Sequence, residues 1–261
     1  MKAPIGIQLY SLRYQCEENF LDTLKKVKES GYDGVEFANY YDGMTAVQLK
    51  KELDRLGLKA LSAHIPLEQT PEQLEELAAF FTTLETPVVN CSGSTVESDE
   101  RVAYAREKLI AAAISFKQSG IDHGYHNHWA EFAVRNDQYI LETMLRPSVR
   151  VPLNAQFDYA WMQAMDVDPV TYTRRWGNRL TPPHFKDAPK NYMDIDPNTD
   201  SALYNVEVGN GIIDFEAVLA TMKNMGTLTR GVVVEQESFT IDPFDSIAIS
   251  AGNIRRWMEK L

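Results

Sequence analysis

The sequence predicts an α/β fold, a single (β/α)8 TIM barrel. Three observations predict it. Short, mostly apolar segments alternate with longer amphipathic ones, eight of each kind occur, and the length of 261 residues suits one such barrel. We therefore expect one domain over residues 1–261, with parallel strands inside and helices outside.

The strand-like segments are short, as buried parallel strands are. They are Ile5–Tyr10, Gly34–Phe37, Ala60–His64, Val88–Cys91, Gly124–Asn127, Val149–Phe157, Leu180–Phe185 and Gly231–Val234. The seventh contains Pro182-Pro183. Because proline removes a hydrogen-bond donor from a central strand, we expect that strand to be short or bulged.

The helix-like segments have apolar residues three and four positions apart. They are Phe20–Ser30, Ala46–Leu56, Pro71–Leu84, Glu100–Gln118, Gln138–Leu145, Pro169–Trp176, Phe215–Met225 and Phe244–Lys260. Several have end signals: Thr70 precedes Pro71 as a capping residue does, and Gly57 and Gly120 follow helix ends. An open nucleotide-binding sheet is disfavoured, since no glycine-rich phosphate loop follows the first strand.

Composition excludes several classes of partner. The net charge of -11 disfavours nucleic acid, whose binding depends on clustered Lys and Arg. The sequence has no apolar run long enough to span a membrane and no signal-peptide pattern near Met1, so we expect a cytoplasmic protein without membrane contact. Cys16 and Cys91 are the only cysteines and lie far apart, which indicates a reducing compartment and no disulfide framework.

Polar and ionisable residues gather where the predicted strands end, and in a barrel that carboxyl face holds the active site. They are Gln8, Tyr10, Glu36, His64, Asn90, Tyr125 to His128, Asp158, His184, Lys186, Asp187 and Glu235 to Glu237. Imidazole and carboxylate groups bind Zn, Mn, Co or Fe, and carboxylate-rich sites favour Mn or Mg. We therefore expect a metal site. A satisfied core histidine is the alternative for His64, and His123, which precedes its strand, is expected at the surface.

Eight motifs in chain order resemble those of a known family. They are Gly6–Arg13, Gly31–Phe37, Ser62–His64, Tyr125–His128 followed by Glu131-Phe132, Phe157–Trp161, His184–Asp187, Val208–Phe215 and Val234–Glu237. Together they resemble the sugar phosphate isomerase/epimerase superfamily with the xylose isomerase-like barrel, in a subgroup with the Tyr-His-Asn-His motif. The resemblance covers nearly the whole chain.

The resemblance implies one divalent metal ion, Mn, Co or Zn, with Mg as a harder alternative. Its ligands come from the fifth to eighth strands, and by position three of them are Asp158, His184 and Glu235. On the fifth strand this sequence has His126 where many relatives have glutamate, so His126 is the expected ligand and Glu131 the fallback. Relatives assemble as dimers or tetramers, which suggests a homo-oligomer.

The implied reaction is sugar isomerisation or epimerisation by proton abstraction next to a carbonyl, through a metal-stabilised enediolate. Relatives use two glutamates as the acid/base pair, and here one is missing. Gln156 and Asn210 also stand where relatives often carry glutamate. The expected catalytic residues are Glu235, Glu131, Lys186 and His64, and the expected substrate-binding residues are Gln8, Tyr10, Glu36, His128 and Trp161.

Other reactions and other classes remain as alternatives. Expulsion of a β-oxygen at the same metal site would make the protein a 3-keto-glycoside lyase or hydrolase, or a polyol dehydratase. A barrel that only binds sugar is a further alternative. An apurinic-site endonuclease of this fold needs a histidine-rich three-metal cluster and a DNA-binding surface, which five histidines and a net charge of -11 do not supply.

Overall fold

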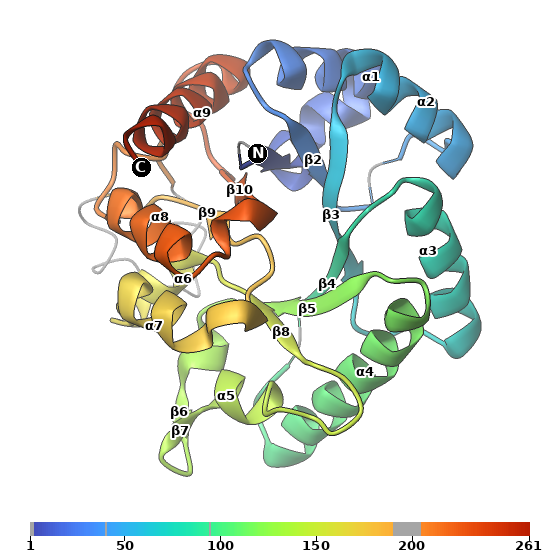
Figure 1. The fold of residues 1–261 in the computed structure, drawn as a ribbon, viewed down its shortest axis with the longest axis vertical. Coiled ribbons are helices and arrows are strands. Elements are labelled where there is room, and N and C mark those ends of the chain that lie inside the picture. The colour runs from blue at the N-terminus through green and yellow to red at the C-terminus, as the bar shows by residue number, and fades with distance from the viewer. Residues whose placement is uncertain (1–2, 40, 94, 190–204) are drawn as a thin grey trace.

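The computed structural model describes residues 3–39, 41–93, 95–189 and 205–261. Eight parallel strands curl into a nearly closed barrel with helices around the outside (Figure 1). Their order is β8-β5-β4-β3-β2-β1-β10-β9. Parallel bridges from Ala155 to Leu180 and from Asp158 to His184 bring the two edge strands, β8 and β9, together. The TIM-barrel class predicted from the sequence is confirmed.

The barrel strands are short and buried. They are β1 (Ile5–Gln8), β2 (Gly34–Phe37), β3 (Lys59–Pro66), β4 (Val88–Ser92), β5 (Asp122–His126), β8 (Asn154–Gln156), β9 (His184–Phe185) and β10 (Val232–Val234). β9 begins only after Pro182-Pro183, as expected for a segment that lacks ladder donors. β1 ends at Gln8 because a 3-10 helix, Leu9–Leu12, begins there.

The outer layer comprises α1 (Arg13–Glu29), α2 (Ala46–Leu56), α3 (Pro71–Thr83), α4 (Asp99–Gln118), α5 (Ile140–Met144), α6 (Tyr159–Ala164), α7 (Pro169–Trp176), α8 (Phe215–Asn224) and α9 (Pro243–Lys260). The starts of α2 and α3 match the prediction because each has a capping box, from Thr45 with Gln48 and from Thr70 with Gln73. α1 begins at Arg13 and is kinked at Asn19, whereas the sequence indicated a start at Phe20.

A hairpin replaces the first turn of one predicted helix. β6 (Val134–Arg135) and β7 (Gln138–Tyr139) pair antiparallel, and the helix expected from Gln138 begins only at Ile140. Asn136 and Asp137 form the turn with φ of 52° and 59°. Two consecutive left-handed residues are typical of the tightest hairpin turns, and Asn and Asp tolerate that conformation.

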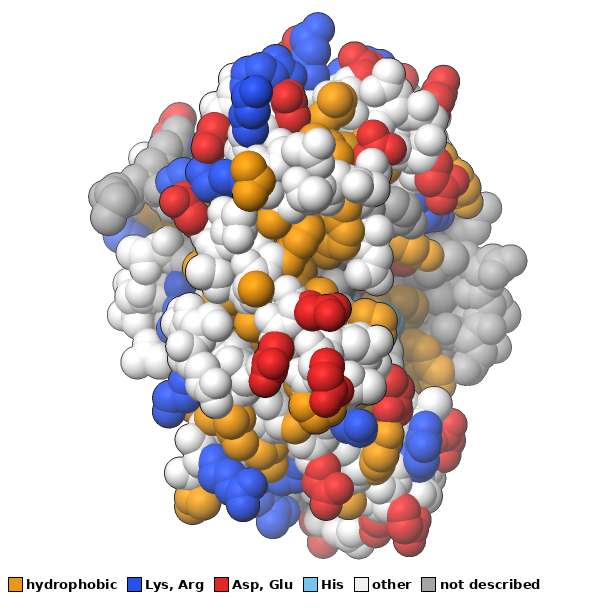
Figure 2. All heavy atoms as spheres, turned by 90° about the vertical axis from the view of Figure 1, so that its right-hand side faces the viewer, with side chains coloured by type: hydrophobic (Ala, Val, Ile, Leu, Met, Phe, Trp, Pro, Cys, Tyr) orange, Lys and Arg blue, Asp and Glu red, His pale blue; other side chains and the backbone are white. Residues whose placement is uncertain are grey.

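The outer face formed by α2, α3 and α4 carries side chains of mixed character. Figure 2 shows acidic, basic and hydrophobic side chains interspersed on the face that α2, α3 and α4 cover. Glu72, Glu75 and Glu76 of α3 are exposed to solvent. Within the described part of the chain, no helix has the length and apolar character needed to cross a membrane.

Candidate metal centre

A cavity of about 610 Å³ opens at the carboxyl ends of the barrel strands. Most of the residues that line it have polar side chains, and they lie at or just beyond strand ends. They are Gln8, Tyr10, Ala38, Asn39, His64, Ile65, Pro66, Ser92, His126, His128, Lys186, Glu235 and Glu237. The parallel register delivers these side chains to one place, because parallel strands of a barrel all end on the same face.

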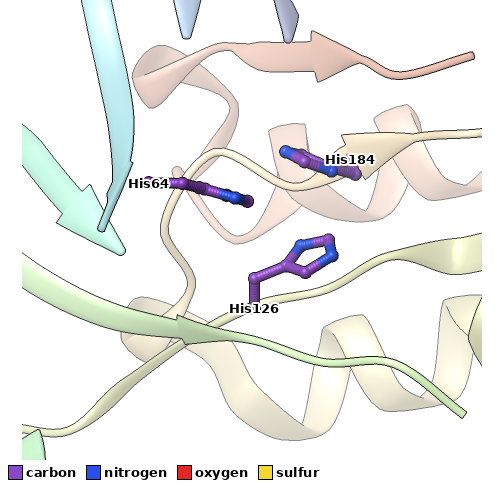
Figure 3. A group of neighbouring side chains, drawn as sticks. All are labelled: His64, His126 and His184. Carbon is purple, nitrogen blue, oxygen red and sulfur yellow. The ribbon is translucent and has the colours of Figure 1, made fainter. Parts of the chain in front are cut away.

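Four buried side chains form one group here: His126 and Glu235, which line the cavity, and Asp158 and His184 beside them. One donor atom of each lies within 4.8 Å of the others. Figure 3 shows His126, His184 and also His64 turned toward one another from β5, β9 and β3. Two imidazoles and two carboxylates form a donor set suited to Mn²⁺, Co²⁺ or Zn²⁺.

Two atoms of this group show that the donor set fits a cation. Oδ2 of Asp158 and Nδ1 of His126 are buried and have no hydrogen-bond partner among the described residues. Oδ1 of Asp158 accepts from the backbone N–H groups of Ala160 and Trp161 at the start of α6. Helix capping thus orients the carboxylate and leaves its other oxygen without a hydrogen bond, 3.6 Å from the Lys186 ammonium. A buried polar atom without a hydrogen bond lowers the stability of the folded protein, and a bound cation would offset that loss.

Lys186 supplies a buried positive charge beside the group. Its ammonium lies 2.5 Å from Glu237, 3.4 Å from Glu235 and 3.6 Å from Asp158, and 5.0 Å from the centre of the Trp161 indole ring. Burial raises the pKa of Asp158 to about 7, although Lys186 opposes that rise. Burial acts in the same direction on Glu235, but Lys186 and His184 hold its pKa well below the usual range.

His184 lies between two carboxylates. Its Nε2 is 2.5 Å from Oε1 of Glu36, and its Nδ1 is 3.2 Å from Oε2 of Glu235. Burial opposes the charged imidazolium, yet the two carboxylates prevail and raise the pKa of His184 to about 10. Without an ion, His184 therefore carries both ring protons at neutral pH.

The predicted site residues differ in their relation to the cavity. The cavity lining includes Gln8, Tyr10, His64, His126, His128, Lys186 and Glu235. Trp161 is 5% exposed and contacts Lys186 instead of lining the cavity, and Glu36 is fully buried. Glu131 accepts from the Tyr125 hydroxyl and the His128 backbone N–H, and it is not in the four-residue group. The geometry therefore favours His126 over Glu131 as ligand, and all these roles stay predictions.

Some residues at the site received no role from the sequence, although Glu237 was among the polar residues at the strand ends and Gln156 was noted in place of a glutamate. Glu237 lines the cavity and pairs with Lys186, and its position two residues after Glu235 was the available signal. Gln156 and Ser62 both donate to buried Glu36. By contrast, His123 is not at the surface as expected: it is 3% exposed and stacks on Phe116 of α4.

Asp187 anchors the loop that returns to the barrel mouth. Its carboxylate accepts from the backbone N–H groups of Ala188, Gly209, Gly211 and Ile213. A Cβ atom at Gly211 would collide with the Asp187 carboxylate and the Ala188 carbonyl. The Gly-Asn-Gly sequence near position 210 is therefore explained by close backbone approach, not by phosphate binding. Most of the preceding loop lies outside the described residues.

Solved structures with this fold include sugar isomerases, epimerases and a dehydratase. A sugar phosphate isomerase/epimerase from Parabacteroides distasonis has a TM-score of 0.80 and 21% identity, covering 98% of this chain and 94% of its own. An L-ribulose 3-epimerase has a TM-score of 0.72 and 16% identity, covering 99% and 95%. The probable 3-DHS dehydratase of petrobactin synthesis from Bacillus anthracis has a TM-score of 0.74 and 14% identity, covering 98% and 99%. At these identities the likeness shows the fold.

The sequence itself matches one family model. The model is described as a xylose isomerase-like TIM barrel, and it matches residues 24–260. No curated protein sequence matches the chain. The match spans the candidate ligands and the carboxyl ends of seven barrel strands, from β2 to β10.

Proposed function

Because the chain belongs to the xylose isomerase-like TIM barrel family, we propose that it is a divalent-metal-dependent sugar isomerase or epimerase. The observation that carries this proposal is the convergence of His126, Asp158, His184 and Glu235 beneath an open cavity. The cavity volume of about 610 Å³ is in the range of small-molecule sites. The polar side chains among its lining suit a polyhydroxylated substrate.

The four converging residues would hold the ion, one donor atom from each. A bound divalent ion supplies Lewis acidity toward a carbonyl oxygen. Lys186 supports the same site with a permanent positive charge, since its ammonium is buried and lies 3.4 Å from Glu235. Charge that develops on a substrate oxygen is stabilised most by such fixed groups in a site with little water.

We assign the proton transfers to Glu235 and His64. Both line the cavity, Glu235 directly after β10 and His64 on β3, two strands that are separated in the barrel by β1 and β2. A carboxylate and an imidazole on separate strands replace the pair of glutamates that relatives use. Abstraction by one group and return by the other to the opposite face epimerises the carbon, whereas return to the adjacent carbon isomerises the sugar.

Substrate contacts are assigned to the remaining polar lining. Tyr10 is 41% exposed and forms part of the cavity wall, and His128 lies beside His126. Burial, together with the nearby charge of Lys186, lowers the pKa of His128 to about 4, so this imidazole is neutral at pH 7. A neutral imidazole both donates and accepts hydrogen bonds, which suits a sugar hydroxyl.

Elimination is a second candidate, favoured by the ion pair of Lys186 with Glu237. This pair lines the cavity, and its ammonium can stabilise an oxygen that leaves the β-position. A dehydratase or 3-keto-glycoside lyase would use the same first step, abstraction of the proton next to the carbonyl. The fate of the substrate after that step distinguishes the two candidates.

The test is solvent deuterium incorporation into a panel of aldoses, ketoses and 3-keto-glycosides, with and without Mn²⁺. We expect ion-dependent exchange at a carbon next to the carbonyl, and loss of exchange in Glu235→Gln and in His184→Ala. His123→Leu is the matched control, because His123 is buried away from the cavity lining. Full exchange in either site variant would refute the assignment.

Metal analysis separates the remaining classes. One equivalent of Mn²⁺, Co²⁺ or Zn²⁺ per chain is expected for the enzyme, and about three equivalents are expected for an endonuclease. Sugar binding without any bound ion would identify a binding protein instead.

A further inference from the structure

One carboxylate beneath the cavity connects five barrel strands. Glu36 of β2 is fully buried, and it accepts hydrogen bonds from side chains of β1, β3, β8 and β9. Its Oε2 receives the Ser62 hydroxyl at 2.5 Å and the Gln156 amide at 2.7 Å. Its Oε1 receives the Gln8 amide at 2.7 Å and faces two imidazoles. A carboxylate has about four lone-pair sites, so Glu36 has none left for a ligand.

The two imidazoles approach Glu36 through the same ring atom. Nε2 of His184 lies 2.5 Å from Oε1 of Glu36, and Nε2 of His64 lies 3.1 Å from it. Nε2 of His64 is also 2.5 Å from Oε1 of Gln156. The amide orientation of Gln156 is fixed, because its nitrogen donates to Glu36 and to the Pro182 carbonyl. Ionised Glu36 and the Gln156 oxygen only accept, so each Nε2 must carry a proton.

We propose that Glu36 is a positioning residue that fixes both His64 and His184 as the Nε2–H tautomer and so makes Nδ1 of each the electron-pair donor. A neutral imidazole has one N–H, and the atom without it is the base or the ligand. The proposal deepens the proposed function and rests on it for the roles of the two Nδ1 atoms. Glu36 itself reaches neither substrate nor ion.

The two freed Nδ1 atoms have different surroundings. Nδ1 of His184 lies 3.2 Å from Glu235, within the candidate ligand group. Nδ1 of His64 has no hydrogen-bond partner among the described residues, and His64 lines the cavity. One carboxylate thereby prepares a ligand and an acid/base group at once. Carboxylates that hold metal-binding histidines in this way fix ring orientation and raise ligand basicity.

The test is long-range 1H–15N NMR of the five histidines, assigned by single substitution. His64 is observed in the ion-free protein, and His184 in protein loaded with diamagnetic Zn²⁺. We expect Nε2–H in both cases. In Glu36→Gln, whose amide cannot accept from every donor around it, we expect mixed tautomers and Zn²⁺ affinity lower by about 10- to 100-fold. We also expect kcat to fall with KM nearly unchanged, because Glu36 does not line the cavity.

The matched control is Ser62→Ala, which removes a donor to the same carboxylate but touches neither imidazole. It should keep both tautomers and change Zn²⁺ affinity by less than about twofold. Nδ1–H on His64 in the native protein would overturn the proposal without any variant, even where Glu36→Gln fails to fold. Unchanged tautomers and affinity in a folded Glu36→Gln would also overturn it. Correct tautomers without ion-dependent exchange on any sugar would instead reject the proposed function and leave the role of Glu36 intact.

Discussion

The residue two positions before Asp158 offers a quantitative test of the barrel interior. Gln156 is fully buried, and its amide nitrogen lies 2.7 Å from the Glu36 carboxylate. The substitution Gln156→Glu would place a second carboxyl at that distance. Two charges 2.7 Å apart repel by about 6 kcal/mol at an effective dielectric constant of about 20.

The introduced carboxyl can avoid this repulsion by binding a proton. Relative to a free glutamate pKa of about 4.3, keeping it protonated at pH 7 costs about 4 kcal/mol, at about 1.4 kcal/mol per pH unit. That cost is below the repulsion, so the folded variant takes up a proton. Its folded pKa is raised above the unfolded value, so the variant matches the wild type best below about pH 4.3 and loses stability as pH rises. A lost hydrogen bond adds about 1 kcal/mol at every pH.

The assay is urea unfolding of wild type and Gln156→Glu from pH 4.5 to pH 8. We expect the difference in free energy of unfolding to grow from about 1.5 kcal/mol at pH 4.5 to about 5 kcal/mol at pH 7. Gln156→Met is the control, because it removes the same amide without adding a titratable group, and its deficit should not change with pH. A deficit for Gln156→Glu that is independent of pH would refute the reasoning.

Three further outcomes are expected. Ion binding at pH 7.5 should release about one proton, because His184 has a pKa of about 10 and must lose its Nδ1 proton to bind the ion. The affinity for the ion should therefore rise with pH toward 10. Calorimetry in buffers of different ionisation enthalpy measures the number of protons released. Lys186→Met should destabilise the ion-free protein by about 3–5 kcal/mol, because the buried carboxylates of Glu235 and Glu237 lose their cation. Mn²⁺ should then raise the melting temperature of the variant by restoring positive charge. A variant whose melting temperature Mn²⁺ does not raise would contradict this. Burial lowers the pKa of His123 to about 4, so the free energy of unfolding of the wild type should fall by up to about 3 kcal/mol as pH drops from about 6.5 to 4. Urea unfolding of His123→Leu should show a weaker dependence on pH.

The helices that the sequence placed best are those with local end signals. Thr45 and Thr70 start α2 and α3 through capping boxes that are complete within four residues of sequence. The hairpin of β6 and β7 was missed although Asn136 and Asp137 suit its turn, because Gln138 onward also reads as an amphipathic helix. β9 is short because Pro182 and Pro183, directly before it, have no backbone N–H to donate, and this property is visible in the sequence.

The sequence by itself determined the fold class and the set of polar residues at the strand ends, because alternation of apolar segments and the identity of the residue that follows each strand are local properties. The candidate ligands Asp158, His184 and Glu235 were named on that basis, together with a family resemblance. The sequence favoured His126 over Glu131 as the fourth ligand, but only the tertiary structure shows that His126 lies in one group with these three, whereas Glu131 lies outside it and accepts from the Tyr125 hydroxyl.

The role of Glu36 also depended on the tertiary structure. From the sequence it was a substrate-binding candidate at the end of the second strand. In the barrel it lies beneath the cavity, where Gln8, Ser62 and Gln156 surround it from three other strands. Side chains that meet from strands distant in sequence leave no local pattern. Closure of the barrel brings them within hydrogen-bond distance, and it places Nε2 of both His64 and His184 against the Glu36 carboxylate.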